Sequence, residues 1–419
     1  MMHDLNIKRS LSLAISFVAM YLYLGMYIGG FYIPSFFVFS TIFIIFVFNP
    51  KLNKSVFKVS VYFILFMLVL ALIGVLRQID IVNVSALLYS FLYLIASILL
   101  FVFTLSFFSR CKPREIEASS LFIVLVITLG AMLEVNFDFV KEVSDTFRSE
   151  FLIHYYSADL RDLHNHWTVR PKFFTAEPSF VAMNIIFLLS LYFLSASYKL
   201  SSMYYFILIF INLFVVGSPV LILGFLIYPI LYLIKTGKSV FSEKLLFIVV
   251  FLVLILFLFI IFLLESRIDS ILIGSDYSHL VRLVFPLQVY YLGNFFEWIL
   301  GIGYGYDNIL IERLSDIFSA YNIDILFSEV ELSNKITNSF YQILIFFGIV
   351  GLLLFFALIK AIFKIFSIGE LYFYFITLFF GFMNIVGGFN SPRFWFFLGG
   401  LIGTIVAIKK LNQNKKKAS

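Results

Sequence analysis

Residues 339–359 read SFYQILIFFGIVGLLLFFALI and contain no Asp, Glu, Lys, Arg or His. A helix rises about 1.5 Å per residue, so a run of this length crosses a hydrocarbon core about 30 Å thick. Comparable apolar runs recur along the whole chain. The stretch predicts a membrane-spanning helix, and its recurrence predicts an all-α, polytopic integral membrane protein.

The composition agrees with this class. Hydrophobic residues make up 62% of the 419 residues, charged residues only 13%, and the mean hydropathy is +1.04. No room remains for an ordinary soluble domain, so we expect one membrane domain over residues 1–419. The first apolar run, 11–28, is too long for a cleaved signal peptide and lacks a small-residue cleavage site. The single cysteine, Cys111, excludes an internal disulfide and a Cys-rich metal site.

We predict about twelve membrane-spanning helices. Over residues 203–234, Pro219 favours two helices over one long kinked helix, because proline breaks the hydrogen-bond ladder of a helix. About 32 residues is also long for one crossing. The predicted helices cover residues 11–28, 31–48, 57–76, 84–107, 119–136, 179–197, 203–217, 219–234, 245–264, 339–359, 371–387 and 394–408.

The distribution of charge predicts the orientation. With the N-terminus inside, the short cytoplasmic loops and tails hold 19 of the 30 Lys and Arg residues, and the outer segments hold 19 of the 24 Asp and Glu residues. Short cytoplasmic loops of membrane proteins are enriched in basic residues. Both termini are therefore expected in the cytoplasm.

Two long outer segments, residues 137–178 and 265–338, interrupt the pattern of short connections. Each is polar with interleaved aromatic residues, and each is too long for a simple connector. Function is therefore expected in these segments. Within the second, residues 283–298 predict an amphipathic helix that lies in the membrane interface.

The first outer segment ends in Arg170-Pro171-Lys172-Phe173-Phe174-Thr175-Ala176-Glu177-Pro178-Ser179. Pro178 suits the first turn of a helix, which places Glu177 at its N-cap. Glu177 is then either a carboxylate stabilised by the helix dipole or a general base. Lys172 suits an interfacial anchor, whereas Arg170 on the outer side indicates an anionic partner. In the second segment, Arg282 suits forked binding of phosphate oxygens.

Other polar motifs carry less chemistry. Gly301-Ile302-Gly303-Tyr304-Gly305 resembles a phosphate cradle only superficially and predicts a tight turn over the membrane surface. His164 and His166 lack a third metal ligand at a sensible spacing and are read as ordinary loop histidines. Glu134, close to the end of a predicted helix, is one of few ionisable residues in the apolar runs, which argues against an ion-coupled transporter.

The pattern of Arg170 followed by Phe174-x-x-Glu177-Pro178-Ser179 resembles the O-antigen polymerase (Wzy-type) family, within the O-antigen polymerase–ligase group. The resemblance extends over residues 165–360, although Pro219 replaces an expected arginine and Thr337 replaces the histidine usual in ligases. Its further elements are Arg282 before Gly301-Ile302-Gly303-Tyr304-Gly305, Asn338-Ser339-Phe340-Tyr341, Gly348-Ile349-Val350-Gly351, and Gly217-Ser218.

The resemblance implies a GT-C-like glycosyltransferase of the bacterial inner (plasma) membrane. It would polymerise undecaprenyl diphosphate-linked oligosaccharides into O-antigen or capsule-like polysaccharide, by inverting transfer on the outer face without a metal or other cofactor. Membrane lipid, a chain-length regulator protein and a flippase are the expected partners, and nucleic acid is not. The implied site comprises Glu177 as catalytic base and Arg170, Arg282, Lys172, His279, Asn338 and Tyr341 as substrate-binding residues.

Two alternatives stay open. A ligase would move finished glycan onto a lipid or protein acceptor, and a transporter would export polysaccharide or lipid-linked oligosaccharide. A transporter usually shows paired halves and charges at mid-membrane depth. The two asymmetric outer segments therefore favour the polymerase.

Overall fold

The structure is a computed structural model that describes residues 2–28, 31–33, 38–40, 52–77, 84–152, 169–197, 200–236, 284–304, 307–320, 336 and 338–418. The chain divides into two compact units. Unit 1 comprises residues 1–51, 103–266 and 397–419, and unit 2 comprises residues 52–102 and 267–396.

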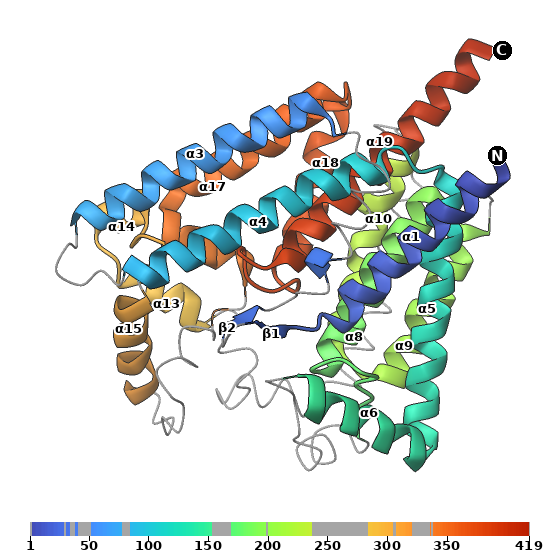
Figure 1. The fold of residues 1–419 in the computed structure, drawn as a ribbon, viewed down its shortest axis with the longest axis horizontal. Helices are drawn as coiled ribbons and strands as arrows, with labels where there is room; N and C mark the ends of the chain where they lie inside the picture. The colour runs from blue at the N-terminus through green and yellow to red at the C-terminus, as the bar shows by residue number, and fades with distance from the viewer. Residues whose placement is uncertain are drawn as a thin grey trace. The chain divides into compact units, whose positions relative to one another are not determined.

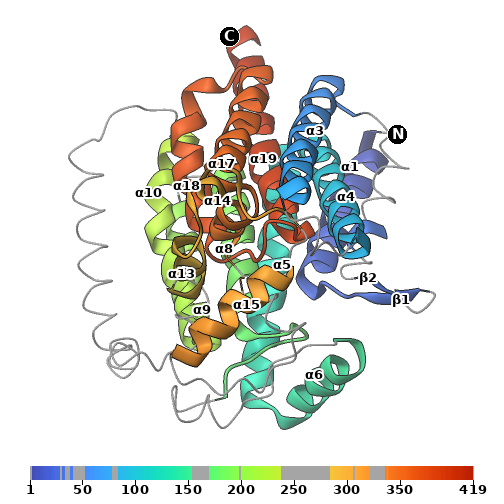
Figure 2. The same ribbon diagram turned by 90° about the vertical axis from the view of Figure 1, so that its left-hand side faces the viewer.

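Unit 1 is built around α8, whose side chains are almost all buried. Helices α5, α9 and α10 pack on α8, and α1 packs on α5. Helix α6 turns away from the C-terminal end of α5 and runs across it (Figures 1 and 2). The elements of this unit are α1 (Met2–Leu22), β1 (Met26–Ile28), β2 (Phe31–Ile33), α5 (Pro113–Asn136), α6 (Asp138–Phe151), α8 (Pro178–Ser195), α9 (Ser201–Val216), the 3-10 helix η2 (Pro219–Leu221) and α10 (Ile222–Thr236).

Unit 2 is built around α17. Helix α3 lies along α17, and α13, α14 and α18 also pack against it (Figure 1). The elements are α3 (Lys54–Arg77), α13 (Phe285–Tyr291), α14 (Phe295–Leu300), α15 (Asp307–Ala320), α17 (Ser339–Ile365), the 3-10 helix η4 (Gly369–Leu371) and α18 (Tyr372–Met383). Two long helices, α4 (Val84–Phe108) and α19 (Pro392–Ala418), contribute residues to both units.

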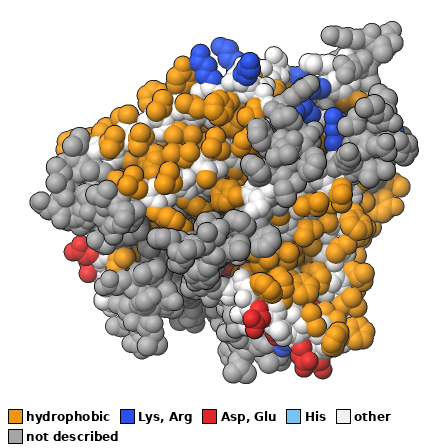
Figure 3. Space-filling view, in the orientation of Figure 1, with side chains coloured by type: hydrophobic (Ala, Val, Ile, Leu, Met, Phe, Trp, Pro, Cys, Tyr) orange, Lys and Arg blue, Asp and Glu red, His pale blue; other side chains and the backbone are white. Residues whose placement is uncertain are grey.

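Seven of the helices in the described ranges are long and apolar enough to cross a membrane. Their exposed side chains include Phe66 on α3 and Phe122 and Leu129 on α5. Hydrophobic side chains accordingly cover wide areas of the molecular surface in Figure 3. Such large exposed apolar areas are not stable in water. The protein is therefore an all-α membrane protein, as the composition predicts, and its described residues add one hairpin of two three-residue strands.

In unit 1 the basic ends of the helices coincide. The Ser119 hydroxyl donates to the Ser10 carbonyl (3.4 Å), so α1 and α5 begin at the same end. The Lys410 ammonium donates to the Ser109 carbonyl (3.2 Å), which brings the end of α19 there. The acidic side chains of α6 lie at the other end of α5 (Figure 3).

Unit 2 shows the same polarity. Gly74, near the end of α3, packs on Gly303, and the Gly303 N–H donates to the Phe346 carbonyl in the first half of α17 (3.2 Å). The two helices therefore run antiparallel, and the basic start of α3 lies with the basic end of α17. In each unit, one end of the helices is basic.

Three predicted elements are corrected. Residues 26–28 and 31–33 form an antiparallel hairpin instead of helix, because Gly29-Gly30 between them favours a two-residue connection. The interfacial helix over 283–298 is two short helices, α13 and α14. Helix 339–359 is interrupted at Gly348, which has φ 64° and ψ −166°.

Other predicted elements agree or lie outside the described residues. The break between helices at Ser218 is confirmed, since α9 ends at Val216 and η2 begins at Pro219. The predicted helix over 245–264 and most of that over 31–48 lie outside the described part of the chain.

Candidate functional site

Glu177 is the N-cap residue of α8, as predicted, with Pro178 in the first turn. Its main-chain carbonyl accepts the Phe180 N–H (3.0 Å), whereas its carboxylate makes no hydrogen bond to the helix backbone. The Ser179 hydroxyl donates to the carboxylate. The side chain is only partly buried. A carboxylate held in this way at the end of a helix suits a base that meets a substrate from outside.

The loop before Glu177 is a tight turn with unusual backbone angles. Phe173 and Phe174 have positive φ values of 30° and 64°. Bulky residues adopt this region rarely, at a cost of about 1–3 kcal/mol each. The Thr175 hydroxyl shares its one proton between the Lys172 carbonyl (2.6 Å) and the Glu177 carbonyl (3.0 Å). Contacts from outside the loop must therefore stabilise it.

The main such contact is Glu134, near the end of α5. One carboxylate oxygen accepts the Lys172 N–H (3.0 Å) and the other accepts the Phe173 N–H (2.6 Å). Glu134 is 6% exposed. A hydrogen bond to a charged group contributes about 1.5–3 kcal/mol. These two bonds are therefore of the size needed to offset the strained turn.

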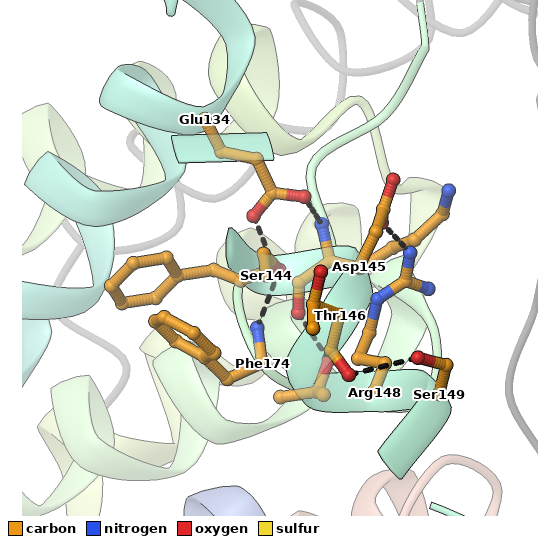
Figure 4. A network of polar contacts seen from close by, with 10 residues as sticks. Glu134, Ser144, Asp145, Thr146, Arg148, Ser149 and Phe174 are labelled. Atoms are coloured by element: carbon orange, nitrogen blue, oxygen red, sulfur yellow. Dashed lines mark hydrogen bonds and ion pairs between the residues drawn. The ribbon is translucent and has the colours of Figure 1, made fainter. Parts of the chain in front are cut away.

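Residues of α1, α5 and α6 complete the support of the loop. The Tyr21 hydroxyl donates to the Phe173 carbonyl (2.7 Å), and the Ser144 hydroxyl accepts the Phe174 N–H (3.1 Å). A Cβ atom at Gly130 would overlap the Phe173 ring, so this glycine provides the seat for the ring. Figure 4 shows Glu134 directed at the loop, with Ser144 and Phe174 beside it.

Arg170 lies against a turn that is distant in sequence. A Cβ atom at position 217 would lie 3.4 Å from the Arg170 Cγ, so the aliphatic part of the side chain packs on Gly217. Gly217 closes α9 in the left-handed conformation, with φ 60°. The structure therefore brings together two motif elements, Arg170 and Gly217-Ser218, that the sequence only places in order.

Lys172 differs from the expected interfacial position, because it is 1% exposed. Its ammonium is enclosed by the protein, where it and Arg148 interact electrostatically with Glu134. Arg148 is itself buried and paired with Asp145 (Figure 4). Binding of a diphosphate by Lys172 stays a prediction, and the described structure gives it a local role in balancing the buried charge of Glu134.

In unit 2, Asn338 is the N-cap of α17 and is fully buried. Its side-chain oxygen accepts the Phe340 N–H (3.0 Å) and the Tyr341 N–H (3.4 Å), and its amide donates to Asn384 (2.8 Å). Tyr341 is half-buried beside Phe340. These contacts are structural, and the predicted roles of both residues toward a glycan stay predictions. Arg282 and His279 lie outside the described residues.

The Gly301–Gly303 segment packs on the break in α17. The helix interruption at Gly348 frees the Ile345 and Phe346 carbonyls, which accept the N–H groups of Ile302 (2.8 Å) and Gly303 (3.2 Å). A Cβ atom at Gly301 would overlap the α17 backbone. The glycines of this bend thus serve close packing on α17, which leaves these two N–H groups unavailable for phosphate. A position of the turn over the membrane surface stays a prediction.

Sequence reasoning missed the residues that hold the Glu177 loop, above all Glu134, Tyr21 and Ser144. A signal existed for Glu134, since an ionisable residue near the end of an apolar helix is a functional candidate by default. Among the described residues, no three His, Cys, Asp or Glu side chains gather as a metal site. His164, His166 and His279 of the outer segments lie outside the described part of the chain.

The fold and this site define a polytopic α-helical membrane protein with a polar, charge-bearing loop at one end of a helix bundle. Comparisons with protein-family models, with curated proteins and with solved structures found no match to this chain.

Proposed function

We propose that this protein is a polysaccharide polymerase that transfers a glycan from one undecaprenyl diphosphate carrier to a repeat unit on another. The observation that carries the proposal is the convergence in unit 1 of Arg170, Gly217 and Glu177 at one end of α8 and α9. These are three elements of the O-antigen polymerase resemblance. Their proximity supports a common site, because sequence order alone does not require it.

The proposed chemistry divides between a base and a cation. Glu177 takes the proton from an acceptor hydroxyl, whose oxygen attacks the anomeric carbon of the donor glycan. The bond from that carbon to the lipid diphosphate breaks with inversion, and the diphosphate leaves with the electron pair. The Arg170 guanidinium stabilises the negative charge that develops on the leaving group. The energy of the diphosphate linkage drives the reaction.

The proposed setting is the outer face of the bacterial inner membrane, in a chain of about twelve spans with a GT-C-like architecture and cytoplasmic termini. The common basic end within each unit supports this orientation. The lipid tail of the carrier would lie along the exposed apolar helix faces. Glu177 and α6 lie at the end opposite the basic termini of unit 1, which suits a substrate delivered from outside.

The test uses purified protein, lipid-linked repeat units and the length of the product. Wild type should make a ladder of polymers. Arg170→Ala should lower the rate by about 10²–10³-fold, the loss typical for one group that stabilises developing negative charge. Arg170→Lys should recover only part, because a point charge does not reproduce the guanidinium fork.

The matched control is Arg114→Ala, which removes an exposed arginine at the opposite end of α5 and should leave the ladder unchanged. A deletion strain separates the alternatives. One repeat unit on the usual anchor supports the polymerase, whereas loss of all attached glycan supports a ligase or an exporter. A normal ladder from Arg170→Ala would reject the assignment of the diphosphate to this arginine.

A further inference from the structure

We infer that Glu134 is a positioning residue that fixes the loop between Arg170 and Glu177 in its reactive conformation. The inference rests on the proposed function, in which these two side chains handle the leaving group and the acceptor. Glu134 itself belongs to α5, and it reaches the site only through the main chain of Lys172 and Phe173.

A carboxylate is the side chain that this position requires. Two consecutive N–H groups, those of Lys172 and Phe173, donate to separate oxygens of one carboxylate at 3.0 and 2.6 Å. An ionised carboxylate only accepts, so it satisfies both donors at once. A glutamine offers one accepting oxygen, and its NH₂ group would face the second N–H. Loss of the carboxylate would leave a buried backbone donor without an acceptor, which is costly.

The contacts form a continuous path from Glu134 to the proposed base. Glu134 holds the N–H groups of Lys172 and Phe173, and the Thr175 hydroxyl then links the Lys172 carbonyl to the Glu177 carbonyl. Arg170 lies two residues before Lys172, whose N–H donates the first of these bonds. A shift of this segment therefore displaces both proposed reactive side chains together.

Two basic side chains lie close to Glu134. Arg148 and Lys172 both interact electrostatically with it, and both are buried. The paired Asp145 balances Arg148. Glu134 is therefore the buried carboxylate beside two buried cations, and Glu134→Gln would remove its charge along with the second acceptor.

The experiment compares Glu134→Gln, Glu134→Asp and the matched control Glu115→Gln in the full-length protein. Glu115 is similarly buried, 7% against 6% exposed, and lies at the other end of the same helix. Amide hydrogen exchange of residues 172–175 reports on the loop, and exchange of α8 reports on the fold. Steady-state polymerisation of lipid-linked repeat units gives kcat and KM.

Glu134→Gln should speed exchange of the Lys172 and Phe173 amides about 10-fold or more, the effect of a loss near 1.4 kcal/mol, without a change in α8. A misplaced reacting group costs on the order of 10²-fold, so kcat should fall by about that factor while KM stays within about threefold. Glu134→Asp should restore part of both. Tyr21→Phe, which removes only the bond to the Phe173 carbonyl, should loosen the loop in the same direction.

Wild-type exchange of the loop in Glu134→Gln would overturn the inference, as would a loosened loop with unchanged kcat. If Glu134→Gln fails to fold, Tyr21→Phe decides by the same two measurements. If the wild type makes no polymer from any repeat unit, the proposed function fails. The exchange data then decide alone whether Glu134 holds the loop.

Discussion

At the scale of the residue, the structure distinguishes the two roles that the sequence allows for Glu177, a helix-capping carboxylate and a general base. Its carbonyl oxygen accepts a helix N–H, and its carboxylate makes no hydrogen bond to the backbone of α8. The cap is therefore a main-chain feature that survives a change of side chain. This separation makes the proposed base testable without loss of the helix.

We predict that Glu177→Gln inserts at normal levels and binds the lipid-linked unit. Its stability should change by less than the roughly 1 kcal/mol of a lost side-chain cap. Loss of a general base typically lowers the rate by about 10²–10⁴-fold, so the variant should make little or no polymer. Product length from purified protein is the measurement, with exposed Glu142→Gln as the control. Near-normal turnover would eliminate Glu177 and direct the search to two other ionisable residues of the outer segment 265–338, Asp276 and His279.

The sequence predicts single residues of the site better than their contacts. Glu177 at an N-cap follows from Pro178 and the apolar run behind it. Two contacts join segments that are far apart in the chain. One is the packing of Arg170 on Gly217, and the other is the hydrogen bond from the Phe173 N–H to Glu134. Such pairs depend on how helices pack, which local patterns do not encode. Glu134 itself is visible in the sequence, but its partners are backbone N–H groups, which every residue except proline has.

At the scale of the element, the described part of the chain follows hydropathy closely, and the exceptions have local causes. Helix α6 lies in a segment that the composition predicts as a polar loop. Phe139, Val143, Phe147 and Phe151 nevertheless recur every four residues there, which is a helical period. In helix α17 the hydropathy pattern fails in the opposite way. The apolar run is continuous, but the helix is interrupted at Gly348. Gly348 holds backbone angles that only glycine adopts readily.

We predict that Gly348→Ala and Gly301→Ala each destabilise unit 2. Strain at a glycine-only conformation costs about 1–3 kcal/mol, and a Cβ atom at either position would overlap backbone of the facing segment. Gly369→Ala is the control, since a Cβ atom there has no atom within 4 Å. Thermal unfolding in detergent should show lower midpoints for the first two variants only. Equal midpoints for all three would mean that the two segments do not pack this closely.

At the scale of the whole molecule, both units have helices with one basic end, and this regularity agrees with the orientation from loop charges. The number of spans is less accessible to sequence reasoning. Apolar runs show which segments are hydrophobic. They do not show whether a run such as residues 26–33 forms a helix or a hairpin. The described helices support seven long candidates for a span, and labelling from the two sides gives the direct test.

We predict that single cysteines at Ser149 on α6 and Ser319 on α15, which are exposed side chains, react with an impermeant thiol reagent in cells with a permeable outer layer. Cysteines at Thr236 and Asn412 should react only after the inner membrane is opened. The background is Cys111→Ser, although burial raises the pKa of the Cys111 thiol and makes it a poor nucleophile near neutral pH. Reversed labelling would overturn the orientation.

The break in α17 also bears on how the protein is made. Until Ile302 and Gly303 dock, the Ile345 and Phe346 carbonyls lack their partners, and an unpaired carbonyl in lipid costs several kcal/mol. Residues 301–303 leave the ribosome before α17 does, so their partner helix arrives second. Folding of unit 2 therefore begins, at this junction, only after synthesis has passed Gly348.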